Sequence, residues 1–176
     1  MPDIEITVAR VDERELIANL FQLYIHDFSE FWAGTASGEL QDDGRFEAYK
    51  PLDLYWREEG RVPLLFRIDG RPIGFALLNG VSHSGRPVDR NMAEFFIVRK
   101  HRRGGVGTAA AQGLFNLYPG LWEAAVVRKN LGALAFWRRA IGEHPEVEDV
   151  EESDSQAPDW NGPILRFRIR SPTAQP

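Results

Sequence analysis

The stretch from Ala93 to Leu117 decides the fold: Ala-Glu-Phe-Phe-Ile-Val, then Arg-Lys-His-Arg-Arg-Gly-Gly-Val-Gly, then Thr-Ala-Ala-Ala-Gln-Gly-Leu-Phe-Asn-Leu. The first segment is rich in aromatic and β-branched residues and predicts a mostly buried strand, whereas the last has apolar residues at helical spacing. Glycines in the middle segment permit close backbone approaches, and the first N–H groups of the helix have no partner within it. We therefore predict an anion site between strand and helix. The cations Arg99, Lys100, Arg102 and Arg103 favour a phosphate or pyrophosphate.

Spacing distinguishes three kinds of phosphate-binding loop. A P-loop needs a lysine directly after its glycines, and none is present. Residues 105–110 match the loose dinucleotide pattern G-x-G-x-x-A, but that fold expects an acid at the end of the next strand, whereas Glu123 stands at its beginning. Residues 102–107, Arg-Arg-Gly-Gly-Val-Gly, fit R/Q-x-x-G-x-G/A after an apolar strand. This third pattern resembles the coenzyme A pyrophosphate loop of the GNAT superfamily of N-acetyltransferases.

A second block follows at the distance expected in that family. A strand is predicted over Trp122 to Val127, and the segment from Asn130 to Trp137 then resembles the family pattern N-x-x-A-x-x-F-Y. Together the two blocks cover the C-terminal half of the core. Glu-Phe-Phe in the strand and Phe-Trp in the helix are also similar to a bacterial branch of predicted acetyltransferases.

The resemblance implies an N-acetyltransferase that moves an acetyl group from acetyl-coenzyme A (acetyl-CoA) to a primary amine. Main-chain groups around Ile97 and Val98 would bind the pantetheine arm, and Asn130 would reach it. The full set of implied cofactor-binding residues is Phe96, Ile97, Val98, Arg102, Arg103, Gly104, Gly105, Val106, Gly107, Thr108, Asn130, Phe136 and Trp137.

The acceptor side is less specific. Glu94 is the predicted catalytic base, because the family often has an acidic residue facing the cleft at this point of the strand; alternatively it only binds a cationic acceptor. The segment around Tyr24, His26 and Asp27 mixes aromatic and ionisable residues, and we interpret these three, with Glu94, as the acceptor-binding wall. A capped helix packed by its aromatic residues would give the same pattern.

The sequence departs from the family at Trp137, where a tyrosine often serves as general acid. Indole cannot release a proton at a useful pH. Either the thiolate, with a pKa of about 8.5, leaves unassisted or with a proton from water, or another tyrosine such as Tyr24 or Tyr118 takes the role.

The remaining pattern predicts one domain over residues 1–172, with a flexible tail at 173–176. We expect an α/β (α+β) fold with a mixed, mostly antiparallel sheet of about six to seven strands and helices on both faces. Asp12, followed by Glu15, is predicted to cap the first helix. Pro51 is predicted to interrupt a helical piece between Phe46 and Trp56, and a strand near Val147 to Val150 is predicted to end in a loop.

Composition limits the partners. The net charge of −5 over 176 residues argues against nucleic-acid binding. The chain has no cysteine, which excludes disulfides, thiolate metal sites and a cysteine nucleophile, and no metal is expected. No signal peptide or membrane-spanning run is recognised, so the expected location is the cytoplasm. The expected partner is a small, cationic amine, and a homodimer is compatible with this interpretation.

Three alternatives stay open at this level. The first is a non-catalytic acyl-coenzyme A sensor, which the missing tyrosine allows. The second is an acetyltransferase that acts on a peptide or protein amine. The third is a nucleotide-binding protein that uses the G-x-G-x-x-A pattern.

Overall fold

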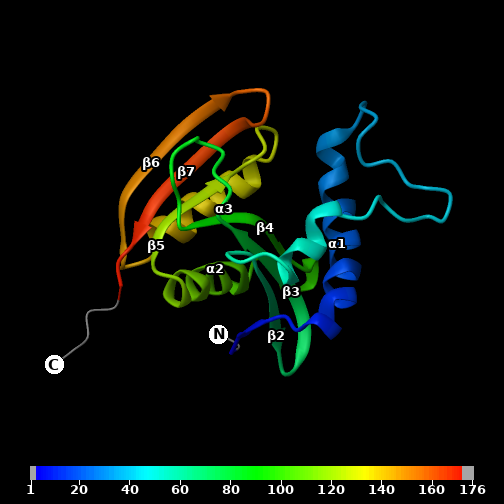
Figure 1. Ribbon diagram of the computed structural model, residues 1–176, viewed down its shortest axis with the longest axis horizontal. Coiled ribbons are helices and arrows are strands. Elements are labelled where there is room, and N and C mark those ends of the chain that lie inside the picture. The colour runs from blue at the N-terminus through cyan, green and yellow to red at the C-terminus, as the bar shows by residue number, and fades with distance from the viewer. Residues whose placement is uncertain (1–2, 172–176) are drawn as a thin grey trace.

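The computed structural model describes residues 3–171, which form one seven-stranded sheet with helices on both faces (Figure 1). The predicted tail at 173–176 lies outside the described residues. The elements are β1 (Glu5–Val8), η1 (Val11–Glu13), α1 (Arg14–Phe28), η2 (Ser29–Trp32), η3 (Lys50–Trp56), β2 (Val62–Ile68), β3 (Arg71–Asn79), β4 (Arg90–Ile97), η4 (Arg99–His101), α2 (Val106–Leu117), β5 (Gly120–Ala125), α3 (Leu131–Gly142), β6 (Val147–Gln156) and β7 (Asn161–Ile169), where η marks a 3-10 helix.

The strand order is β1-β2-β3-β4-β5-β7-β6, and every neighbouring pair is antiparallel except β4 and β5. The prediction of a mixed, mostly antiparallel sheet is therefore confirmed. Asp69 and Gly70 form the turn between β2 and β3, and both residues have the positive φ that a tight hairpin turn requires. Within residues 3–171, no helix is long and apolar enough to cross a bilayer.

The sheet separates two apolar cores. Side chains alternate along β3, so that Phe75 and Leu77 pack on the α1 and η3 side, whereas Ala76 and Leu78 pack against α2 and α3. All four are fully buried. Each helix is thus fixed by burial of its apolar face, and the site lies where the elements of both layers meet the centre of the sheet.

Strands β4 and β5 pair over only two positions, Arg90 with Trp122 and Asn91 with Glu123. Beyond these positions the strands no longer pair. A bulge lies in β4 just after this point, because Leu78 faces Met92 while Leu77 faces Glu94, which leaves Ala93 as the extra residue. The bulge shifts the alternation by one residue and puts Asn91 and Glu94 on the same face.

The start of the first helix differs from the prediction. A 3-10 turn precedes α1, and the capping carboxylate is that of Glu13, which accepts the Arg10 N–H at 2.9 Å. Glu13 also accepts from Arg67 on β2 at 2.8 Å, a long-range contact that favours it over Glu15. Asp12 instead pairs with the Arg10 guanidinium at the surface. Pro51 likewise stands in the first turn of η3 rather than interrupting a helix, since that turn needs no N–H at this position.

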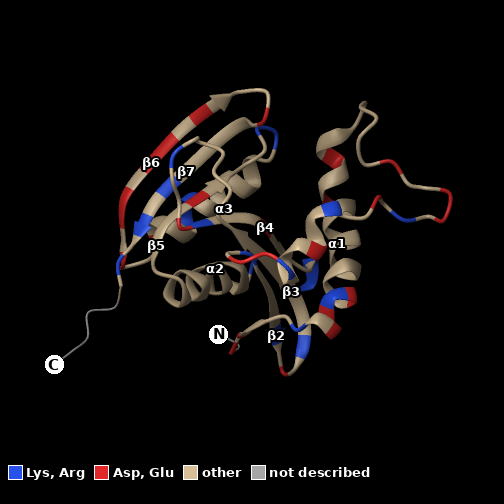
Figure 2. Ribbon diagram, viewed as in Figure 1, with Lys and Arg blue, Asp and Glu red and all other residues tan. Residues whose placement is uncertain are grey.

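The strand in the acidic segment after α3 is also longer than predicted. Strand β6 continues past Val150 to Gln156 instead of ending in a loop, and pairs with β7 on both sides of a bulge between Glu148 and Glu151. Acidic residues recur along β6 (Figure 2). Their side chains pair with arginines of β7 and other elements, such as Glu152 with Arg138. This pairing reduces the repulsion that made the run resemble a loop.

Candidate active site

The glycine-rich loop leads into helix α2 and exposes its N-terminus. Gly105 is the residue before the helix and has φ +80°, a left-handed conformation that favours glycine. No side chain caps this end, so the first N–H groups of α2 have no side-chain acceptor among the described residues. At Gly104 an added Cβ would meet no atom within 4 Å, whereas at Gly107 it would approach the Phe136 ring to 3.2 Å. Gly104 thus leaves space beside the loop, and Gly107 allows α2 to pack closely on α3.

Two arginines beside the loop are held by a carboxylate from α1. Asp27 accepts from Arg99 Nε at 2.8 Å and Nη2 at 2.7 Å, and its other oxygen pairs with Arg102. Burial raises the pKa of Asp27, but the hydrogen bonds from both arginines outweigh it and hold the pKa below its usual value. Asp27 is therefore engaged with the loop side of the site, while His26, its neighbour, has a largely exposed side chain.

The edge of β4 that faces β5 presents main-chain groups without a strand partner. The N–H of Val98 donates to Ile73 O on β3 at 2.9 Å, and its carbonyl accepts from His101 at 3.0 Å. Because main-chain groups alternate along an antiparallel strand, those of Phe95 and Ile97 point the other way, toward β5. Ile97 O accepts from Arg102 Nε at 2.6 Å. The main-chain groups of Ile97 therefore face β5, those of Val98 are engaged within the protein, and Phe95 is an addition that the sequence did not reveal.

The second motif lies on α3, next to this edge. Asn130 caps the helix, because its Oδ1 accepts the Ala133 N–H at 2.9 Å. The Phe136 ring stacks on Phe95 at 5.6 Å, and Trp137 lies edge-on to Phe95 at 5.2 Å. Trp137 is buried in the core on the α2 and α3 side. An aromatic cluster therefore fills the α3 side of the separated strands.

Glu94 lies on the opposite face of β4, in a pocket of tyrosines. The surrounding hydroxyls come from three segments: Tyr24 on α1, Tyr49 just before η3, and Tyr55 within η3. Burial raises the pKa of Glu94 to about 7, although hydrogen bonding by Tyr24 and Tyr49 acts to lower it. The carboxyl group can thus gain or lose a proton near neutral pH. Tyr49 and Tyr55 were missed in the sequence because only the tertiary fold brings them to Glu94.

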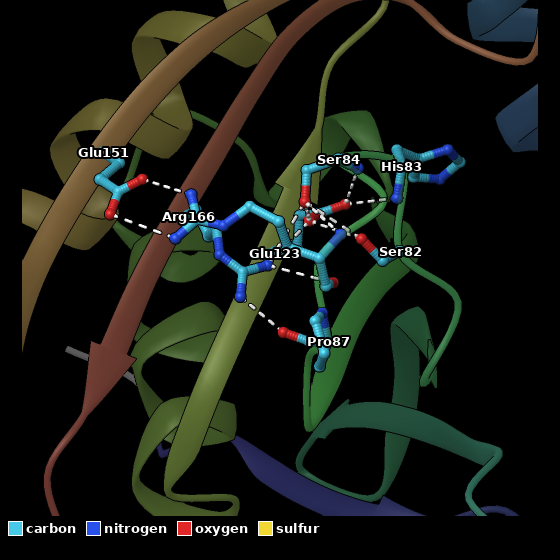
Figure 3. A network of polar contacts seen from close by, with 8 residues as sticks. Ser82, His83, Ser84, Pro87, Glu123, Glu151 and Arg166 are labelled. Atoms are coloured by element: carbon cyan, nitrogen blue, oxygen red, sulfur yellow. Dashed lines mark hydrogen bonds and ion pairs between the residues drawn. The ribbon is translucent and has the colours of Figure 1, made fainter.

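A second acid, Glu123, is wholly buried and has a different environment (Figure 3). It accepts from the Ser84 hydroxyl at 2.6 Å and the His83 N–H at 2.5 Å, and pairs with Arg166 at 3.3 Å. Arg166 also donates to the Pro87 carbonyl at 2.5 Å. This network fixes the β3–β4 segment over β5 where pairing with β4 ends, and the His83 ring points away from it (Figure 3). In the sequence, the sign of this network is a single acidic residue, Glu123, in an otherwise apolar strand.

The two substitute general acids suggested by the sequence lie far apart. Tyr24 faces Glu94, whereas Tyr118 follows the C-terminal end of α2, opposite the glycine loop, where its ring lies under Arg90 at 5.4 Å. Twelve residues of helix separate Tyr118 from the loop. Only Tyr24 is therefore placed beside the candidate base.

Comparisons with known proteins agree with this geometry. The model of the acetyltransferase (GNAT) family matches residues 17–142. A search of curated proteins found no match. Similar solved structures include an acetyltransferase from Thermus thermophilus, 15% identical over 97% of this chain and 99% of that one, with a TM-score of 0.63.

Two further structures carry named acceptors. The aminoglycoside acetyltransferase AAC(6')-Ib, in complex with coenzyme A and kanamycin, is 14% identical over 96% of this chain and 95% of that one, with a TM-score of 0.63. The ribosomal-protein-S18-alanine N-acetyltransferase from Escherichia coli is 11% identical over 99% of each chain, with a TM-score of 0.56.

The fold and site define an acyltransferase that places a glycine loop, an unpaired strand edge and a half-buried carboxylate around one gap in a sheet. The chain belongs to the GNAT family of acetyltransferases, since the family match covers most of its length, and is an acetyl-CoA-dependent N-acetyltransferase.

The contacts of Glu123 lead to a prediction about the stability of the fold. Glu123→Ala should lower the free energy of unfolding by about 3 kcal/mol, because it leaves Arg166 buried without its charge partner. Glu151→Ala is the control: it removes a solvent-exposed pair with Arg86 and should cost far less. Urea denaturation of both variants measures the difference. Equal losses would show that burial does not strengthen the Glu123 contacts.

Glu94 makes a prediction about pH. Its pKa of about 7 exceeds the ordinary value of 4.5, so its contribution to stability is fully present below pH 4.5 and is lost as pH rises through 7. Glu94→Gln has no carboxyl group at this position, so its stability does not fall with pH in this way. Relative to the parent, its free energy of unfolding should therefore rise by about 1–3 kcal/mol between pH 4.5 and 7 and then stay level. Denaturation at pH 5 and pH 8 tests this, and a variant that does not gain on the parent over this range would contradict the raised pKa.

Proposed function

We propose that this protein acetylates a primary amine of a small, cationic acceptor, with Glu94 as the general base. The observation that carries the proposal is the tyrosine-lined carboxylate on β4, directly after the point where β4 and β5 stop pairing. Family membership gives acetyl transfer as the reaction, and the position of Glu94 gives it a proton acceptor.

The described residues fit coenzyme A. The uncapped start of α2, the open space at Gly104 and the nearby cations Lys100 and Arg103 suit a pyrophosphate. Main-chain groups of Phe95 and Ile97 suit an amide-containing arm along the edge of β4. Val106 and Thr108, both in the first turn of α2, follow the loop directly. When bound, the cofactor supplies an activated acetyl thioester.

Phe96, predicted as a cofactor contact, is buried on the α1 side, so we assign it a supporting role under Arg102. Asn130 would serve through the end of α3 that it caps. The Phe136 and Trp137 rings would form the apolar side of the cofactor gap.

Glu94 addresses the main chemical obstacle, the charge on the amine. Removing the proton from a lysine-like ammonium at pH 7 costs about 4–5 kcal/mol. A carboxylate with a pKa of about 7 is half ionised at neutral pH, and can bind the ammonium and then take its proton directly or through water. The hydroxyls of Tyr24 and Tyr49 stabilise the ionised form.

No described side chain is needed to protonate the leaving thiolate. Trp137 is buried in the core, and burial raises the pKa of Tyr24 well above its usual value. Tyr24 thus keeps its proton and acts as a hydrogen-bond donor. A thiolate with a pKa of about 8.5 can leave and take a proton from water.

A cationic acceptor is favoured because the acceptor side carries the carboxylate of Glu94 among uncharged tyrosines. Similar structures include acetyltransferases named for aminoglycosides and spermidine, and also one named for a ribosomal protein. A panel of polyamines, amino sugars and peptides, read by release of free thiol, tests the acceptor class. Turnover restricted to peptides would overturn the small-molecule proposal.

The loop assignment predicts that Gly104→Glu abolishes coenzyme A binding. The substitution meets no neighbouring atom, so the fold should persist, but it puts a negative charge beside the start of α2. Gly142→Glu, at the far end of α3 and also in open space, is the matched control and should bind normally. Calorimetry with coenzyme A gives the comparison, and unchanged affinity in folded Gly104→Glu would refute the assignment.

The base assignment predicts that Glu94→Gln lowers kcat/KM by about 10²-fold or more, while coenzyme A affinity stays unchanged. In the parent, kcat/KM should rise with pH through about 7, and the variant should lose this limb. Glu15→Gln, at an exposed position of α1, is the control. A loss confined to the acceptor KM would show that Glu94 only binds the ammonium.

A further inference from the structure

Asp27 joins the helix of the acceptor side to the loop of the cofactor side. Its carboxylate, on α1, binds Arg99 and Arg102, which frame the start of the glycine loop. The Asp27 side chain is only 18% exposed. Arg102 continues the connection into β4, since its Nε donates to Ile97 O at 2.6 Å and its guanidinium lies over the Phe96 ring at 5.3 Å. The last turn of α1 is therefore fixed to the end of β4.

The same face of α1 carries a hydroxyl to the candidate base. Tyr24 precedes Asp27 by three residues, so both side chains lie on one side of the helix. The Tyr24 ring packs edge-on against Phe96 at 5.9 Å and Phe75 at 6.1 Å. Phe96 thus lies between Arg102 and Tyr24. The contacts form a closed ring from Asp27 through Arg102 and Phe96 to Tyr24, and back along α1.

We propose that Asp27 is a positioning residue: by holding Arg99 and Arg102, it fixes the last turn of α1 and so keeps the Tyr24 hydroxyl at Glu94. The proposal rests on the proposed function, in which Glu94 is the base. It replaces the expectation that Asp27 contacts the acceptor, because both of its oxygens are already bound to arginines.

Because Asp27 is negatively charged, the proposed role predicts the direction in which removing its charge changes the affinity for coenzyme A. The loop carries Arg99, Lys100, Arg102 and Arg103, and Asp27 offsets one of these four charges. Asp27→Asn therefore leaves the loop more positive, which should maintain or strengthen attraction for phosphates. General loosening of the site would instead weaken coenzyme A binding and impair the base together.

The effect on Glu94 follows from its neighbours. The groups that face it are Tyr24 from α1, Tyr49 from the segment before η3, and Tyr55 from η3. Displacing Tyr24 removes one hydroxyl that favours the carboxylate, while the other two stay with η3. The pKa of Glu94 should then rise by about one unit.

The test compares Asp27→Asn with Tyr24→Phe and with the double variant. The Glu94 pKa is measured by carbon NMR of its labelled carboxyl group, which requires no turnover, and coenzyme A affinity by calorimetry. We expect each single variant to raise the Glu94 pKa, the double variant to raise it no further than Tyr24→Phe, and Asp27→Asn to bind coenzyme A at least as tightly as the parent. Asp12→Asn, which breaks an exposed pair with Arg10, is the control and should change neither quantity.

Three results would overturn the proposal: an unchanged Glu94 pKa in Asp27→Asn, additive shifts in the double variant, or weakened coenzyme A binding in the folded Asp27→Asn variant. Should Asp27→Asn not fold, Arg99→Gln, which frees one oxygen of the same carboxylate, must raise the pKa in the same direction. Failure of the proposed function is recognised separately. In that case no amine is acetylated, while the NMR titration still decides the role of Asp27.

Discussion

The early end of pairing between β4 and β5 is the constraint on which the rest of the site depends. Two register positions hold the strands together, and beyond them the main chain of β4 faces β5 without a ladder partner. Unpaired main-chain groups are costly when buried, so such an edge persists only where a ligand or solvent can satisfy it. The aromatic rings of α3 pack along one side of the separated strands, and the glycine loop begins where β4 ends. The proposed cofactor site is thus a consequence of how the sheet divides.

Glu123, which is wholly buried, and Glu94, which is half-buried, show how its surroundings decide the role of a carboxylate. Glu123 is satisfied by backbone and hydroxyl donors and by Arg166, so its charge is neutralised within the protein. Glu94 has no cation beside it among the described residues and is surrounded by tyrosines, so burial raises its pKa to about 7. The first arrangement stabilises the β3–β4 segment. The second costs stability at neutral pH and gives a group able to exchange protons there.

Some basic residues of the loop bind other parts of the protein rather than a ligand. Arg99 and Arg102 are bound to Asp27, and Arg102 in addition to the carbonyl of Ile97, so both act within the protein. In the proposed phosphate site, the uncapped N–H groups at the start of α2 then contribute more than the run of basic residues suggests. An acidic chain can bind an anionic cofactor in this way, because the positive field is local to one helix end and its loop.

The sequence by itself determined the features that depend on neighbouring residues. The glycine loop, the Asp69-Gly70 hairpin, the Asn130 cap and the individual strands and helices follow from turn chemistry and hydrophobic period, which act over a few positions. Glu94 was predicted as the base from its place in the strand, where the family that the sequence resembles often has an acidic residue.

Only the tertiary structure decided how these parts work together. The extra residue at Ala93 sets the face of Glu94, and a bulge depends on the register between two strands. Tyr49 and Tyr55 reach Glu94 from a segment about forty residues away in sequence, and Asp27 meets arginines over seventy residues later. Local patterns cannot encode these contacts, because they exist only after the sheet has formed and the helices have packed on its two faces.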